Sequence, residues 1–243
     1  PGREGSALTD RPILFSAPMV RALLAGTKTQ TRRVLKGTGL LDLGMRVTER
    51  GVPVSTDDWG VLHYRPLPFA AGDRLWVREA WRTFVSLEST RPADLYRPGE
   101  RGAGVAYEAD RSGMAITKQG GVTFGPREMD TGAFGKLRPG IHMPRWASRL
   151  TLHVTEVRVQ RLQEISVQDA IDEGIEPLPS GEYRDYADTG YVPGVAPPYD
   201  ARGSYATLWA SINGVESWAA NPWVVAVSFL VEKANIERAS RAE

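Results

Sequence analysis

Residues 150–162 read LTLHVTEVRVQRL, and this stretch does most to decide the fold. Apolar residues recur at every second position from Leu150 to Val154, and again at Val157 and Val159. A period of two is that of a β-strand, whose successive side chains point to opposite faces. We therefore predict a long strand here, with the other elements arranged around it.

A short helix is expected directly after this strand, at residues 165–175 (ISVQDAIDEGI). Ser166 is a residue type that caps helix N-termini, and Asp169 stands three positions later, as in a capping box. Gly174 is suited to end the helix because glycine adopts a positive φ without steric cost. The pattern predicts a helix that ends near this glycine.

The C-terminal third supplies one more helix and one more strand. Residues 204–214 (SYATLWASING) are typical of a helix that ends at Gly214, and the Pro-, Gly- and Tyr-rich residues 177–203 predict a loop before it. Residues 221–233 (NPWVVAVSFLVEK) predict a closing strand, apolar enough to be buried on both faces. The charged residues 234–243 are expected to continue as an exposed helix or to fray.

The N-terminal half mixes strands and helices in the same way. Residues 13–15 (ILF) predict a strand, Ser16 a helix cap and Gly26 the end of that helix. A Gly-Asp turn at residues 72–73 leads into a further strand, LWVR. Short strands interleaved with three short helices predict the α+β class, with a curved or closed sheet.

The middle of the chain is the least regular part. Residues 84–140 contain many glycines and prolines and predict mostly long loops, with one strand at 105–110 (VAYEAD). Residues 59–67 (WGVLHYRPL) predict a short strand or hairpin arm.

The composition excludes several classes of protein. Cysteine is absent, which rules out disulfides, thiol catalysis and cysteine-ligated zinc. A net charge of +1 argues against a strong non-specific duplex binder, although it is compatible with a local basic pocket. No stretch approaches the ~18 apolar residues of a membrane span. The first ten residues lack a signal-peptide pattern, and with the absence of cysteine this favours a cytoplasmic protein.

The segment richest in chemistry is residues 26–33, GTKTQTRR. Its threonines alternate with Lys28, Gln30 and Arg32, which predicts a strand with two different faces. A buried lysine can activate a hydroxyl nucleophile, and arginine can bind phosphate or carboxylate with two hydrogen bonds. The same residues also suit a polar strand edge in water. The segment is not a P-loop, because only one glycine precedes the lysine.

Two further groups are candidates for a site. Glu173 falls at the end of the predicted helix, where the helix dipole disfavours a charged carboxylate; the alternative is an ordinary surface glutamate. Trp76, Arg78, Glu79 and Trp81 gather around one strand end, where aromatic rings beside arginine can stack on a base. The alternative is that these tryptophans pack in the core. The three histidines are widely spaced and have no acidic cluster, so no metal site is expected.

Together these segments resemble the ASCH (activating signal cointegrator homology) domain of the PUA-like superfamily. The shared features, in the family's order, are GTKTQTRR (26–33), the Gly-Asp turn into LWV (72–77), the long strand, the glutamate-bearing helix and the closing strand. The resemblance implies a PUA-like β-barrel with short flanking helices and long inserted loops. It covers roughly half of the chain and implies a single domain at residues 11–233, with insertions at about 37–70, 84–148 and 177–203 and a charged tail at 234–243.

WVREAW and RPGIHMPRWASRL (138–150) also resemble segments of longer ASCH-like proteins that are common in phage and prophage genomes. The motif match extends to small bacterial ASCH proteins that hydrolyse N4-acetylcytidine to cytidine and acetate. In those proteins Gly-x-Lys-Thr-x-Thr-x-Arg carries a catalytic lysine and threonine, and a glutamate from the later helix completes the set. The resemblance thus implies catalytic roles for Lys28, Thr31 and Glu173, without a metal or organic cofactor. The expected substrate-binding residues are Arg33, Trp76, Arg78 and Glu79.

The leading expectation is an amidohydrolase acting on an acylated or otherwise modified pyrimidine nucleoside or nucleotide. Two alternatives stay open. One is a module that binds RNA or a modified base without chemistry, with Lys28 and Arg33 on phosphate. The other is a metal-independent ribonuclease that uses the same lysine and the RNA 2′-hydroxyl. The expected partner is a modified nucleoside, RNA or DNA, with no membrane or metal; the oligomeric state is left open.

Overall fold

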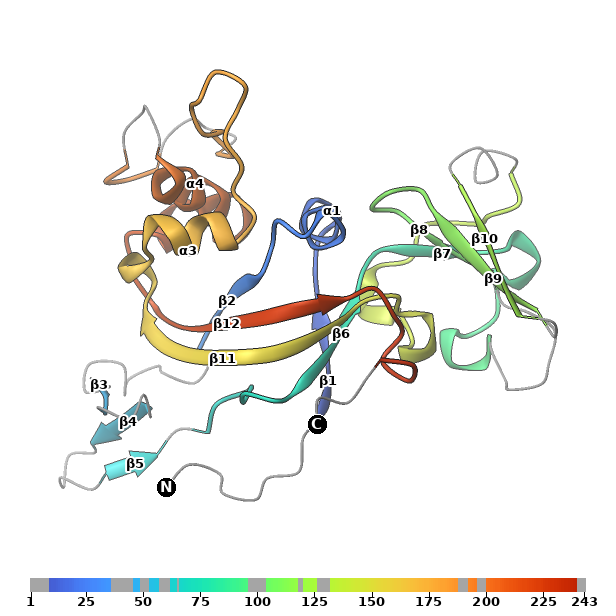
Figure 1. The fold of residues 1–243 in the computed structure, drawn as a ribbon, viewed down its shortest axis with the longest axis horizontal. Helices are drawn as coiled ribbons and strands as arrows, with labels where there is room; N and C mark the ends of the chain where they lie inside the picture. Colours follow the sequence, from blue (N-terminus) through green and yellow to red (C-terminus); the bar gives the residue numbers. More distant parts are fainter. Residues whose placement is uncertain are drawn as a thin grey trace. The chain divides into compact units, whose positions relative to one another are not determined.

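The structure, a computed structural model, describes most of the chain. The described residues are 9–35, 46–48, 53–56, 62–64, 66–95, 104–117, 120–125, 132–187, 192–195 and 200–239. They form helices and three sheets, the largest of which is mixed, with the strand order β1-β6-β11-β12-β2 (Figure 1). The chain therefore has the α+β architecture that the sequence predicts.

The mixed sheet contains both long strands that the sequence predicts. Its strands are β1 (Asp10–Leu14), β6 (Arg74–Arg78), β11 (Thr151–Arg161), β12 (Trp223–Glu232) and β2 (Gln30–Val34). β1 runs parallel to β6, whereas β11 is antiparallel to β6 and β2 is antiparallel to β12. β11 and β12 confirm the strands predicted at 150–162 and 221–233.

The described residues divide into two compact units. The first comprises Pro1–Ala25, Gly72–His153 and Val231–Glu243, and the second comprises Gly26–Ala71 and Val154–Leu230. Each unit combines segments that are distant in the sequence.

The first unit contains α1 and a sheet that the sequence does not predict. α1 (Ala17–Ala25) follows Ser16 and ends before Gly26, whose φ is +80°, as expected. The four-stranded antiparallel sheet has the order β10-β9-β8-β7. Its strands are β7 (Trp81–Thr83), β8 (Gly104–Tyr107), β9 (Gly113–Thr117) and β10 (Gly120–Phe124). β8 confirms the predicted strand at 105–110.

The prediction of loops for the rest of 84–140 is wrong for β9 and β10. Strands of this length are too short for a clear period of two, and they form because they pair with neighbours. Trp81, Val105, Tyr107 and Met143 pack together beside this sheet, each at most 2% exposed. Burial of these large side chains gives the first unit its own apolar core.

The segment after β12 is also more ordered than the sequence predicts. The Asn235 side-chain amide donates to three backbone carbonyls within residues 145–148. Ile236 is 1% exposed, and the Arg74 guanidinium donates to the carbonyl of Ala239. The expectation of an exposed or frayed tail is therefore wrong for the described part of this segment, because side-chain donors bind its backbone.

The second unit contains two helices beside one end of the mixed sheet. α3 (Val167–Asp172) begins with the predicted capping box: Ser166 Oγ accepts from Asp169 N at 3.0 Å, and the Asp169 carboxylate accepts from Ser166 N at 3.3 Å. α4 (Ala201–Asn213) ends at Gly214, as predicted, where φ is +94°. The two helices pack against each other, and α3 also contacts β2 (Figure 1).

A core between these helices and the sheet holds the second unit together. It includes Leu162, Ile165, Ala170, Tyr205, Trp209 and Val224, all at most 5% exposed. A small antiparallel sheet in the same unit has the order β3-β4-β5, with β3 (Arg46–Val47), β4 (Pro53–Thr56) and β5 (Leu62–Tyr64). β5 falls within the strand predicted at 59–67. None of the helices formed by the described residues has the length and apolar character needed to cross a membrane.

Candidate functional site

The lysine of residues 26–33 meets the glutamate after α3 inside the second unit. Lys28 Nζ lies 2.7 Å from Glu173 Oε2, and it also donates to the backbone carbonyls of Glu173 at 2.9 Å and Gln30 at 2.8 Å. Lys28 is 0% exposed and Glu173 is 5% exposed. An ammonium group has three protons, so these three acceptors use all of them. The pair is a fully hydrogen-bonded internal ion pair.

Local backbone contacts bring the two residues together. Thr29 N donates to Asp172 O at 2.8 Å, which joins the segment before β2 to the end of α3. Phe229 N donates to Thr29 O at 2.9 Å, so this carbonyl points toward β12. Successive carbonyls of a strand point to opposite sides, so that of Gln30 points away from β12. Lys28 hydrogen-bonds this carbonyl on the side of β2 that faces away from β12.

The second carboxylate oxygen of Glu173 is held by an arginine. Arg32 Nη1 lies 3.1 Å from Glu173 Oε1 and 2.5 Å from Gln30 Oε1, and Arg32 Nη2 lies 3.1 Å from Asp169 Oδ2. Arg32 is 3% exposed. Glu173 therefore receives a lysine on one oxygen and an arginine on the other, which fixes the plane of its carboxylate.

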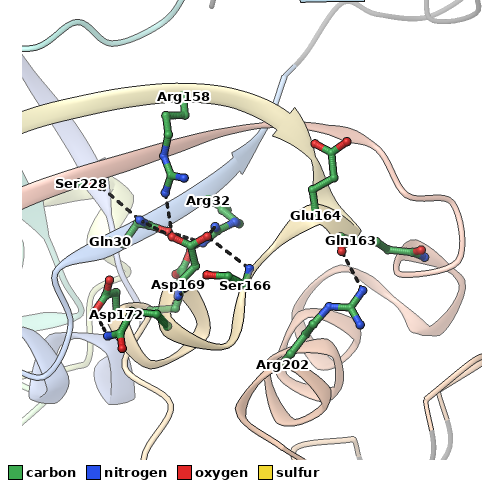
Figure 2. Close-up of polar contacts among 12 residues, drawn as sticks. Gln30, Arg32, Arg158, Gln163, Glu164, Ser166, Asp169, Asp172, Arg202 and Ser228 are labelled. Atoms are coloured by element: carbon green, nitrogen blue, oxygen red, sulfur yellow. Dashed lines mark hydrogen bonds and ion pairs between the residues drawn. The ribbon is translucent and has the colours of Figure 1, made fainter.

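Asp169 extends this network to the two long strands (Figure 2). Its Oδ1 accepts from Arg158 of β11 at 2.7 Å and from the Gln30 side chain at 3.1 Å. The Gln30 amide also donates to Ser228 of β12 at 3.2 Å. The network thus joins β2, β11, β12 and α3 through buried and partly buried polar contacts beside the Lys28–Glu173 pair.

Burial and charge perturb two groups of this network. Burial lowers the pKa of Lys28, because a charged amine loses its hydration inside the protein, and the nearby Glu173 carboxylate partly offsets this effect. Burial alone would raise the pKa of Asp169, but hydrogen bonds from Arg158 and Gln30 outweigh it and hold the pKa at about 2. Asp169 is therefore a permanent anion at neutral pH, and Lys28 is an amine that gives up its proton more readily than usual.

Thr31, the third expected catalytic residue, is 2% exposed in β2. It is paired with Val227, whereas Gln30 is paired with Ser228, so alternation places the Thr31 side chain on the sheet face opposite to Gln30 and Arg32. The Lys28 ammonium nevertheless contacts the carbonyl of the peptide that joins Gln30 to Thr31. The structure thus places the Lys28 ammonium beside the Thr31 backbone. The Thr31 side chain itself lies on the opposite face of the sheet from Arg32.

Of the expected substrate-binding residues, only Arg33 lies in the same unit as Lys28. Arg33 is partly buried, which lowers its pKa, and the charge of Glu173 opposes this shift. Trp76, Arg78 and Glu79 belong to the first unit. The Arg78 guanidinium carbon lies 4.5 Å from the Trp76 ring centroid, as in a cation–π pair.

Glu79 has a clear structural partner. Arg149 Nε and Nη2 each lie 2.8 Å from one Glu79 carboxylate oxygen, and Glu79 is 1% exposed. Arg149 Nη1 also binds Asp110 at 2.8 Å, and the guanidinium carbon lies 4.0 Å from the Tyr107 ring centroid. Arg149, which lies just before β11, thus ties the residue after β6 to the loop after β8.

The sequence does not assign a site role to several residues that surround the Lys28–Glu173 pair. Asp169 is recognised from the sequence only as a capping residue, and Arg32 only as one member of a polar segment. Tyr205 of α4 has no sequence signal at all, because its place depends on the packing of α4. Its ring centroid lies 5.9 Å from the Arg32 guanidinium carbon. Burial and the Glu173 charge raise the Tyr205 pKa well above 10.

The described residues contain no group of three or more histidine, aspartate or glutamate side chains suited to a metal ion. Comparisons with protein-family models, with curated proteins and with solved structures give no match to this chain. The resemblance to the ASCH family therefore rests on its sequence motifs alone.

Proposed function

We propose that the protein is an amidohydrolase built on a PUA-like barrel of the ASCH type, acting on an acylated or otherwise modified pyrimidine nucleoside or nucleotide such as N4-acetylcytidine. The observation that carries this proposal is the Lys28–Glu173 pair, with Nζ and Oε2 2.7 Å apart and both residues at most 5% exposed. A structural ion pair rarely needs this degree of burial, because desolvation removes most of its Coulombic gain.

Lys28 can serve as the general base once its ammonium has lost a proton. A low-dielectric site favours the neutral amine more than water does. Burial lowers the Lys28 pKa, so this amine gives up its proton more readily than an exposed lysine, as a general base requires.

In the proposed reaction Lys28 accepts the Thr31 hydroxyl proton while the Thr31 oxygen attacks the amide carbonyl. The tetrahedral intermediate collapses, the C–N bond breaks, and Lys28 returns the proton to the N4 amine of the leaving cytosine ring. A water molecule then hydrolyses the acyl ester on Thr31, with Lys28 again as the base. The register of β2 places the Thr31 side chain on the sheet face opposite to Gln30 and Arg32. The step therefore requires this side chain to approach Lys28 Nζ when substrate binds.

Arg78 leaves room for a second candidate function. Its guanidinium carbon lies 4.5 Å from the ring centroid of Trp76, which is itself only 6% exposed, so the guanidinium is the group on which an unpaired base would stack. A module of this kind would bind RNA or a modified base without chemistry, and its affinity would fall steeply with salt.

The test is chromatographic turnover of a panel of N4-acylated cytidines and cytosines, with an RNA oligonucleotide included. Lys28→Arg keeps a cation beside Glu173 but removes the base, because a guanidinium does not deprotonate in proteins. Lys136→Arg makes the same change at an exposed lysine of the first unit and is the matched control. We expect the wild type and the control to release the free base and Lys28→Arg to be at least ~100-fold slower. No turnover of any acyl compound would overturn the proposal, and cleavage of the RNA would point to a ribonuclease.

A further inference from the structure

Tyr205 is a buried polar residue next to the Lys28–Glu173 pair, and the hydrogen-bonding capacity of its hydroxyl is unused. Within the part of the chain that the structure describes, no hydrogen bond of the Tyr205 hydroxyl is found, although the residue is only 4% exposed. The three protons of Lys28 all have acceptors, and both carboxylate oxygens of Glu173 have donors. A buried phenol normally finds a partner.

The position of Tyr205 connects it to the same cluster. The Arg32 guanidinium carbon lies 5.9 Å from the Tyr205 ring centroid, and Arg32 Nη1 lies 3.1 Å from Glu173 Oε1. Arg32 Nε also lacks a hydrogen-bond partner, but that atom is sealed from solvent, whereas the Tyr205 hydroxyl is not among the sealed polar atoms. Within the described residues, the hydroxyl is therefore a donor beside this cluster that no protein acceptor uses.

The ring is held in place by α4 packing. Tyr205 belongs to the core cluster of the second unit, and its ring centroid lies 6.2 Å from that of Trp209. A phenol fixed in this way offers its O–H in one direction without a cost of reordering. Because its pKa lies well above 10, it stays protonated, and so remains a donor, throughout the pH range in which a lysine base works.

From this geometry we propose that Tyr205 is a catalytic residue that donates a hydrogen bond to the amide carbonyl oxygen of the substrate and stabilises the oxyanion formed when the carbonyl is attacked. This role rests on the proposed function and adds to it a donor from α4. Preorganised donors of this kind act mainly on the transition state, so they raise kcat more than they lower KM.

The test is Tyr205→Phe, which keeps the ring in the core and removes only the hydroxyl. We expect kcat for N4-acetylcytidine to fall ~100-fold or more, with KM within about twofold. Tyr183→Phe is the control, because Tyr183 packs against the same core and should keep wild-type kcat. An unchanged kcat in Tyr205→Phe, or a change in KM alone, would overturn the role while the amidohydrolase proposal stands.

If the wild type turns over no substrate, the amidohydrolase proposal fails and a second measurement decides on Tyr205. Protein labelled with ¹³C on the tyrosine rings is titrated with N4-acetylcytidine, and the Tyr205 resonance is assigned as the one missing from Tyr205→Phe. A shift of that resonance would support Tyr205 as a ligand contact. No shift would overturn it.

Discussion

Glu173 Oε2 lies 2.7 Å from Lys28 Nζ, although 145 positions separate the two residues in the sequence. The other oxygen of the same carboxylate lies 3.1 Å from Arg32 Nη1. One carboxylate therefore contacts two cations inside the second unit, and Asp169 supplies the second negative charge beside Arg32. The stability of this unit and the proposed chemistry depend on the same few atoms.

Breaking the Lys28–Glu173 pair should be costly. Glu173→Gln leaves the buried Lys28 ammonium without a carboxylate and should lower the free energy of unfolding by about 3–5 kcal/mol, whereas Lys28→Met leaves Glu173 paired with Arg32 and should cost less. The double variant should lose less than the sum of the single losses, by about 1–3 kcal/mol. Urea unfolding measures all three. Glu108→Gln, which breaks a half-exposed pair with Arg82, is the control and should cost about 0–1 kcal/mol.

The Thr31 hydroxyl should be essential for turnover and dispensable for folding. Thr31→Val keeps the shape of the side chain opposite Val227 and removes the nucleophile, so turnover of N4-acetylcytidine should fall by more than ~1000-fold. Thr31→Ser keeps a hydroxyl and should retain a measurable rate. If Thr31→Val stays active, the Lys28–Glu173 pair activates water directly, and Thr31 is a residue of the sheet interior.

Acid should weaken the second unit through Asp169. Its pKa is about 2 in the folded protein against 3.8 for the unperturbed group, so its stabilising effect is complete above about pH 4 and is lost as the pH falls toward 2. The shift corresponds to about 2 kcal/mol. Asp169→Asn should show a shallower loss of stability between pH 5 and pH 2 than the wild type in urea unfolding. Asp172→Asn, on the exposed side of the same helix, should keep the wild-type slope.

The Glu79–Arg149 pair should be a structural contact of the first unit. Glu79→Gln removes one side of a buried two-pronged ion pair, so the free energy of unfolding should fall by about 3 kcal/mol or more. Arg149→Lys keeps the charge but only one of the two hydrogen bonds to Glu79, and it should give an intermediate loss. Thermal unfolding measures both. Equal stability of Glu79→Gln and the wild type would contradict this role and return Glu79 to the candidates for substrate binding.

Local sequence patterns predicted the strands with a clear hydrophobic period and the helices with a clear capping residue. The period of two in residues 150–162 predicts β11, and the Ser166–Asp169 box predicts the start of α3. Gly214 marks the end of α4. In each of these cases the physical cause lies within a few residues of the element itself.

The short strands β9 and β10 could not be predicted in this way. Each has five residues bounded by turns, and each becomes a strand because a neighbour supplies its hydrogen bonds. The segment after β12 follows the same rule: its charges predict exposure, but the Asn235 side chain binds three carbonyls that are about 90 positions earlier in the chain.

The sequence by itself determined the mixed α+β class, the positions of the long strands and the capped helices, and the polar character of residues 26–33. Only the tertiary structure decided that Lys28 is buried against Glu173, that Arg32 and Asp169 complete the ion-pair network, and that Tyr205 lies beside it. The reason is physical. Periods and caps depend on neighbouring residues, whereas desolvation and charge pairing depend on which distant segments the packed core brings together.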